Sequence, residues 1–119
     1  MRSERELLKG STPTLILAVL EEAPRHGYAI AREIERRSAS ALSLGEGSLY
    51  PQLHALEREG LIAGTWEMPT GGGTSRKVYT LTEAGQTELI QRTRNWRAFV
   101  RAIEDVLQRG GREPDVQPI

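Results

Sequence analysis

The apolar residues of the segment 13–23 fall on nearly every side of a helix, which is typical of a helix at the centre of a core. They are Leu15, Ile16, Ala18, Val19 and Leu20. Thr12 can serve as the N-cap with Pro13 at the first helical position, and Pro24 ends the helix. We therefore expect a helix over 13–23 in the middle of the fold.

Two further helices are predicted from apolar stripes of the same period. The first covers 27–38, and its buried stripe is expected to hold Tyr28, Ile30, Ala31 and Ile34. Its outward arginines are Arg32, Arg36 and Arg37, which are either a solvated face or DNA contacts. A connection rich in Ser, Gly and Ala follows over 38–47. The segment 48–59 then carries Leu49, Leu53 and Leu56 at i, i+4 and i+7, which predicts the third helix.

Local signals bound this third helix. Ser48 is the expected N-cap, so Pro51 falls in the first turn, where the amides have no partner within the helix to lose. Gly60 is the expected glycine just beyond the last turn.

After Gly60 the apolar period changes from helical to two, which predicts a pair of strands. The first alternates through Ile62, Gly64, Trp66 and Met68, and the second through Lys77, Tyr79 and Leu81. The glycine-rich segment 69–75 forms the turn between them. We expect one β-hairpin with Trp66 in its core, and a last helix capped by Thr82 with Glu83 in its first turn.

The last helix carries a heptad-like stripe whose members are spaced alternately by four and three residues. They are Leu89, Thr93, Trp96, Val100, Ile103 and Leu107, with Phe99 beside them. A helix over 82–109 would be roughly 40 Å long, which is more than a core of this size can cover. A second copy of the chain is the simplest cover, and the alternative is packing against the first helix. Leu7 and Leu8, which have no obvious place in a monomer, are expected at the same dimer interface.

Composition adds limits rather than a function. At 119 residues the chain has room for one core, and without cysteine it has neither disulfides nor thiolate chemistry. No apolar run reaches the length of a signal or membrane segment, so a soluble cytoplasmic protein with no membrane partner is expected. Sixteen basic residues balance sixteen acidic ones, which is unusual for a nucleic-acid binder. From Met68 to Thr82 there is no acidic residue, and the charged residues there are Arg76 and Lys77. The distribution of charge therefore permits DNA binding without proving it.

The predicted order of helix, helix, connection, helix, hairpin and helix is that of a winged helix-turn-helix, a mainly α class with a small β-hairpin. In that fold the third helix enters the DNA major groove. Its face opposite the leucines holds Gly47, Pro51, His54, Ala55 and Arg58, with Ser48 and Tyr50 at the flanks. The hairpin, or wing, offers Thr74, Ser75, Arg76 and Lys77. The expected organisation is a DNA-binding domain over 1–81, a dimerisation helix over 82–109 and a disordered tail over 110–119.

The segments HGYAIAREIE, GEGSLYPQLHALEREGLI and RKVYTLTEAG resemble the PadR family of transcriptional regulators, and the likeness extends over roughly 5–107. The resemblance implies a repressor that binds a palindromic operator as a homodimer through its C-terminal helix. It implies DNA contacts at Tyr28, Ser48, Tyr50, Pro51, Gln52 and His54, and at Arg76 and Lys77 in the wing. Gln52 falls beside the buried stripe, which conflicts with that role. Tyr50 can instead pack against the wing.

The resemblance also implies a site for a small flat aromatic effector at the dimer interface, lined by Trp96, Phe99 and Val100. The alternative is a plain packed interface. No cofactor is expected, and His26 and His54 are too few for a metal site; His26 is expected as a cap or a phosphate contact. No nucleophile and base occur together as an enzyme would need. The remaining alternative is a winged-helix interaction module that does not bind DNA.

Overall fold

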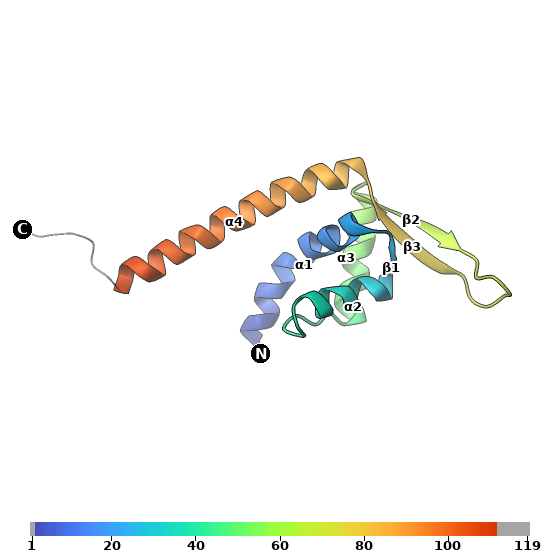
Figure 1. Ribbon diagram of the computed structural model, residues 1–119, viewed down its shortest axis with the longest axis horizontal. Helices are drawn as coiled ribbons and strands as arrows, with labels where there is room; N and C mark the ends of the chain where they lie inside the picture. The colour runs from blue at the N-terminus through green and yellow to red at the C-terminus, as the bar shows by residue number, and fades with distance from the viewer. Residues whose placement is uncertain (1, 112–119) are drawn as a thin grey trace, which may run out of the picture. The chain divides into compact units, whose positions relative to one another are not determined.

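The computed structural model describes residues 2–111, with side chains from residue 10 to residue 108. Its elements are α1 (Arg2–Glu22), β1 (Arg25–His26), α2 (Gly27–Arg37), α3 (Glu46–Arg58), β2 (Ile62–Glu67), β3 (Arg76–Leu81) and α4 (Glu83–Gly111) (Figure 1). This order, with a small antiparallel sheet, is that of a winged helix-turn-helix. The predicted mainly helical fold class is therefore confirmed.

The chain divides into two compact units, residues 1–89 and residues 90–119. The first unit contains α1 to α3, the sheet and the start of α4, and the second contains the remainder of α4. No helix among the described residues is both long enough and apolar enough to cross a membrane.

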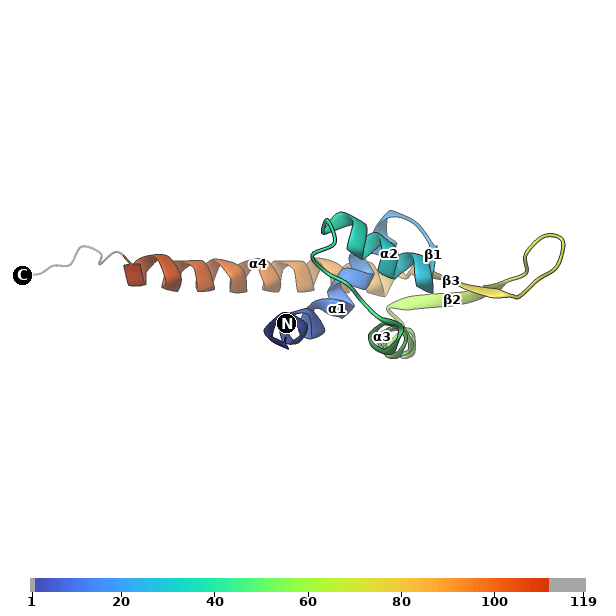
Figure 2. The same ribbon diagram turned by 90° about the horizontal axis from the view of Figure 1, so that it is seen from below.

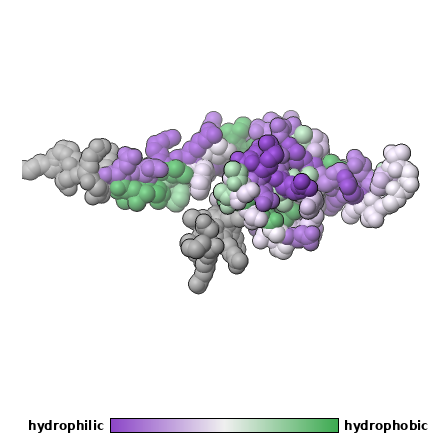
Figure 3. Space-filling model, turned by 60° about the horizontal axis from the view of Figure 1, so that its bottom comes forward, coloured by the Kyte–Doolittle hydropathy of each residue, from purple (hydrophilic) through white to green (hydrophobic). Residues whose placement is uncertain are grey.

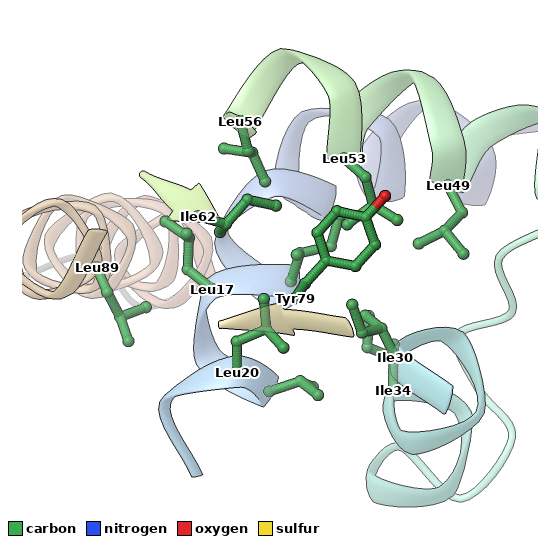
Figure 4. Close-up of a cluster of buried hydrophobic side chains, with 12 residues drawn as sticks. Leu17, Leu20, Ile30, Ile34, Leu49, Leu53, Leu56, Ile62, Tyr79 and Leu89 are labelled. Atoms are coloured by element: carbon green, nitrogen blue, oxygen red, sulfur yellow. The ribbon is translucent and has the colours of Figure 1, made fainter. Parts of the chain in front are cut away.

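The core of the first unit lies where α1, α2, α3 and the sheet meet (Figure 4). Its fully buried side chains are Ile16, Leu17, Ile30, Leu49, Leu53 and Ile62. Tyr79 and Leu89 join the same cluster from β3 and α4. The predicted central place of the segment 13–23 and the inward stripe of α3 are confirmed.

α1 is longer than predicted, because it begins at Arg2 and contains Pro13 in its interior. Thr12 is 2% exposed and lies within the helix, so its prediction as the N-cap was wrong. A proline removes a single amide from the hydrogen-bond ladder, at a cost of about 3 kcal/mol. Burial of the following turn offsets that cost, and the segment before Pro13 is rich in helix-forming residues.

α3 also begins earlier than predicted, at Glu46, with Gly45 rather than Ser48 as its N-cap. The backbone of Gly45 is extended, and its carbonyl accepts the amides of Ser48 at 3.1 Å and Leu49 at 2.9 Å. Pro51 consequently lies inside the helix rather than in its first turn. The sequence-based start was misplaced because a glycine cap uses backbone geometry and carries no side-chain signal.

The end of α3 agrees with its prediction. Gly60 has a φ of 77°, its amide donates to the carbonyl of Glu57, and the amide of Leu61 donates to the carbonyl of Leu56. These two bonds close a Schellman motif, which needs a residue in the left-handed region and so favours glycine.

The sheet has the strand order β1-β3-β2 and is antiparallel throughout (Figure 2). β2 and β3 form the predicted hairpin, in a register that pairs Ile62 with Leu81 and Glu67 with Arg76. β1 was missed, because two residues are too short to show alternation; His26 pairs there with Val78.

Two aromatic residues expected to be buried are exposed. Trp66 is 67% exposed, because the hairpin continues past the last core pair, Gly64 and Tyr79. Tyr28 is also exposed, since only Ile30 and Ile34 of its helix turn fully inward with Gly27. The placements of Trp66 in a wing core and of Tyr28 in a buried stripe were therefore wrong.

α4 starts as predicted, because the amide of Gly85 donates to Oγ1 of Thr82 at 3.0 Å. Leu89 is 5% exposed and belongs to the core of the first unit, so its assignment to the dimer interface is corrected. The side chains of Leu7 and Leu8 lie outside the described residues, as does the segment 112–119 of the expected tail. The helix itself continues to Gly111.

The part of α4 in the second unit has two unlike sides. Green apolar side chains gather along one side of this helix and purple polar ones along the other (Figure 3). Its large exposed apolar residues are Ile90, Trp96, Phe99, Ile103, Val106 and Leu107.

Candidate nucleic-acid interface

α3 presents one face to the core and another to solvent. Leu49, Leu53 and Leu56 are buried, while the side chains at four predicted contact positions are exposed. These are Ser48, Pro51, His54 and Arg58. Gln52 is only half-buried, as its place beside the leucine stripe predicted. The helix thus carries a mixed surface of hydroxyl, imidazole and guanidinium groups suited to contacts with phosphates and base edges.

Two glycines stand at the start of α3, Gly45 as its N-cap and Gly47 in its first turn. A Cβ added at Gly45 or at Gly47 would meet nothing within 4 Å, and neither backbone lies in the left-handed region. Glycine within a helix is less stable than alanine by about 1 kcal/mol, a cost that applies to Gly47. Because a glycine has no side chain, the backbone amides of this turn that lack a partner within the helix are left uncovered. Glu46 is the one acidic side chain in the turn.

Tyr50 is packed more tightly than its neighbours on this helix. An added Cβ on Gly27 would lie 3.0 Å from Cε1 and 3.2 Å from the hydroxyl oxygen of Tyr50. The ring also packs against the core cluster. Its neighbour is therefore the start of α2, and Gly27 is the small residue that lets the ring fit.

The three outward arginines of α2 differ in their partners. Arg36 and Arg37 both donate to Glu33, at distances down to 2.6 Å, and Arg37 also pairs with Glu22. The hydrogen bonds from Arg36 and then Arg37 lower the pKa of Glu33 from 4.5 to about 2. Two of the arginines are thus neutralised by acidic neighbours, which favours the solvated-face alternative for them.

Arg32 has a different environment. Its guanidinium carbon lies 5.5 Å from the centroid of the exposed Tyr28 ring, within cation–π range. Among the described residues it forms no salt bridge. Arg32 and Tyr28 therefore form an exposed aromatic–cationic pair on α2.

The wing places Arg76 beside a histidine. Nη2 of Arg76 lies 3.4 Å from Nδ1 of His26, and Nε2 of His26 lies 3.3 Å from Oε1 of Glu67. Since guanidinium can only donate, Nδ1 accepts and Nε2 carries the proton toward the carboxylate. His26 occupies the N-cap position of α2, but its side chain forms no cap hydrogen bond. Beyond this point the turn takes positive φ values of 83°, 97° and 105° at Gly71–Gly73.

Lys77 is engaged within the protein. Its Nζ donates to Oε1 of Glu57 on α3 at 2.9 Å and lies 5.7 Å and 5.4 Å from the ring centroids of Trp66 and Tyr79. This hydrogen bond raises the pKa of Lys77 and lowers that of Glu57. Sequence reasoning missed the role of Glu57, because the two residues are distant in sequence and no periodicity links a helix to a strand.

On α4, two of the three predicted effector-site residues contact each other. The ring centroids of Trp96 and Phe99 are 6.1 Å apart with an interplanar angle of 38°, while Val100 is half-buried. Both aromatic rings are at least half exposed, at 50% and 58%. Among the described residues, no group of three histidine or acidic side chains is arranged to hold a metal ion.

Comparisons with known proteins give a consistent result. Residues 16–91 match the model of the transcriptional regulator PadR-like family. An uncharacterised protein of Lysinibacillus sphaericus is 30% identical over 105 residues, which are 88% of this chain and 94% of that protein. The structure of a PadR family transcription regulator from Clostridium difficile R20291 is 30% identical, with a TM-score of 0.70 over 82% of this chain and 98% of that one. A transcriptional regulator from Clostridium thermocellum is 25% identical, with a TM-score of 0.77 over 84% and 96%.

Proposed function

The chain belongs to the PadR-like family of transcriptional regulators, and we propose that it represses transcription by binding a palindromic operator as a homodimer. The family consists of regulators and not of enzymes. We also propose that a small flat aromatic effector binds at the dimer interface.

The main support for the proposed DNA interface is the uncovered start of α3. Gly45 and Gly47 have space around them that the protein does not fill, and their backbones do not need glycine. Glycines at these two positions would let a phosphate or a groove wall approach closely, and backbone amides at a helix N-terminus favour an anion.

The remaining proposed contacts extend from this turn. Ser48, Pro51, His54 and Arg58 would lie along the major groove, with Tyr50 and Gln52 at the edge of the contact. Tyr28 and Arg32 would contact the backbone from α2, and Arg76 would do so from the wing. These cations supply local positive charge on a chain whose net charge is zero.

The homodimer is proposed to form through α4. Its exposed Trp96, Phe99, Ile103 and Leu107 recur along one side of the helix, with Val100 between them. Exposed apolar surface of this kind marks an interaction site. Two copies would present two α3 helices to half-sites about one helical turn apart, roughly 34–36 Å.

Substitution of Gly47 by alanine tests this proposal. A duplex is first selected from a random library with the wild-type chain, and its affinity is then measured by gel shift. We expect Gly47→Ala to fold at least as stably as the wild type but to bind about ten- to hundredfold more weakly, the effect of losing well-placed contacts.

Gly10→Ala is the matched control, because a Cβ at this glycine in α1 also meets open space. It should leave the affinity unchanged. If the library yields no bound duplex even at low salt, the chain is a winged-helix interaction module and the DNA proposal is wrong. If duplex binds and Gly47→Ala binds equally well, α3 does not approach DNA by its first turn.

A further inference from the structure

Among the described residues, one ion pair joins the wing to α3, and its lysine is already surrounded by groups of the protein. We propose that Lys77 is a positioning residue, which fixes the wing against α3 through Glu57 instead of contacting a phosphate. This inference rests on the proposed function, since it concerns how the two DNA-contacting elements are held in place.

The surroundings of the ammonium group support this role. Oε1 of Glu57 accepts from Nζ at 2.9 Å, and the faces of Trp66 and Tyr79 lie within cation–π range of the same atom. The lysine side chain is mostly buried, at 24% exposed. A carboxylate and two aromatic rings thus surround a group that has three hydrogens to donate.

Gly64 makes the path of Lys77 possible. A Cβ added at Gly64 would collide with Cε of Lys77 and would lie 3.1 Å from Oε2 of Glu57 and 3.2 Å from Cε1 of Tyr79. The backbone of Gly64 has no positive φ, so its conformation does not call for glycine. Glycine inside a strand often marks a close approach, and here the group that approaches is the lysine chain on its way to α3.

The location of the pair explains why it matters. Lys77 is paired with Trp66, one row on the same face beyond Gly64 and Tyr79, where the hairpin leaves the core. Core packing of Ile62 and Tyr79 fixes the start of the hairpin against α3, but this packing ends at the pair of Gly64 and Tyr79. The bond to Glu57, which lies near the end of α3, extends this constraint to the row of Lys77 and Trp66, where the exposed part of the wing begins.

Salt-dependent DNA affinity distinguishes positioning from direct contact. We expect Lys77→Gln and Glu57→Gln each to weaken binding of the selected duplex by about tenfold, the usual range of coupling through packed side chains. The double variant should be no weaker than either single one, because the two residues act as a unit. The slope of log affinity against log salt should not change in any of them.

A direct phosphate contact predicts the opposite pattern. Lys77→Gln would then lower the salt slope by about one. Glu57→Gln would strengthen binding, because it removes a negative charge and releases the lysine. Either result would overturn the inference.

Two control variants separate charge and stability from position. Glu59→Gln removes an exposed carboxylate at the end of the same helix and should not weaken binding. Lys77→Arg, which keeps a cation that can reach Glu57, should restore part of the affinity. Thermal unfolding of every variant is measured alongside.

The remaining outcomes are also decisive. If Lys77→Gln and Glu57→Gln unfold at lower temperature but bind normally while folded, the pair is merely structural and the positioning role is wrong. If the wild-type chain binds no duplex, the proposed function fails first. A stability cycle on the two residues would then still report whether the pair forms.

Discussion

α3 and α4 both carry an apolar stripe at helical spacing, yet the stripe of α3 is buried while most of the stripe of α4 is exposed. The three leucines of α3 are at most 2% exposed, whereas Trp96, Phe99 and Leu107 of α4 are 50% to 69% exposed. The stripe of α3 meets α1, α2 and the sheet within one compact unit. Periodicity therefore identifies a face that needs a partner, but it does not say whether that partner belongs to the same chain.

The stripe on α4 also changes character along its length. Leu89 is buried in the first unit, while the members beyond it belong to the second. A single uninterrupted pattern thus serves a protomer core at one end and the proposed dimer at the other.

The largest effect is expected from Trp96→Glu, which places a charge in the middle of the proposed interface. Burying an unpaired carboxylate is costly, so the chain should become monomeric in sedimentation equilibrium while remaining folded. Arg94→Glu is the control, because this exposed residue lies on nearly the opposite side of the helix, and it should stay dimeric. A Trp96→Glu dimer, or a wild-type monomer, would show that the α4 stripe does not join two copies.

The next effect compares one residue from each stripe. Leu53→Ala leaves a cavity in a fully buried site and should lower the free energy of unfolding by about 2–5 kcal/mol. Its loss in Tm should be similar at every protein concentration. Ile103→Ala should lose less stability, and its loss in Tm relative to the wild type should change with protein concentration, because association stabilises the folded state by mass action.

Thermal unfolding over a hundredfold range of protein concentration checks both variants. If the loss in Tm relative to the wild type varies with concentration equally in the two variants, their sites are not distinct in the way their burial indicates. Absence of any dependence in the wild type would agree with a monomer.

Much of the fold could be predicted because its signals are local. Gly60, Thr82 and the three leucines of α3 each fixed an element through one cap or one stripe. The start of α3 could not, because the cap at Gly45 uses only backbone atoms. The helix before Pro13 was missed because a single proline does not outweigh burial of the turns beyond it.

For the candidate site, the sequence predicted which side chains are exposed better than it predicted which residues they contact. The outward face of α3 follows from the helical wheel, so Ser48, His54 and Arg58 are exposed as expected. What sequence could not supply were contacts between elements, such as Lys77 with Glu57. Those depend on how a strand crosses a helix, and they decide which cations remain available to DNA.

The smallest expected effect concerns a small ligand at the exposed aromatic pair of α4. We expect a planar bicyclic aromatic such as quinoline to insert beside Trp96 and Phe99 in the dimer, because the rings are close and still accessible. Binding should quench tryptophan fluorescence and release the selected duplex in a gel shift.

The two tryptophans of the chain make this test specific. Trp66→Phe leaves Trp96 as the reporter and should still be quenched, whereas Trp96→Phe leaves Trp66 and should not. Cyclohexanol, which lacks a flat π face, should have neither effect on the wild type. If quinoline quenches neither variant and releases no duplex, the aromatic pair only packs an interface, and the apolar side of α4 needs no occupant beyond a second copy of the chain.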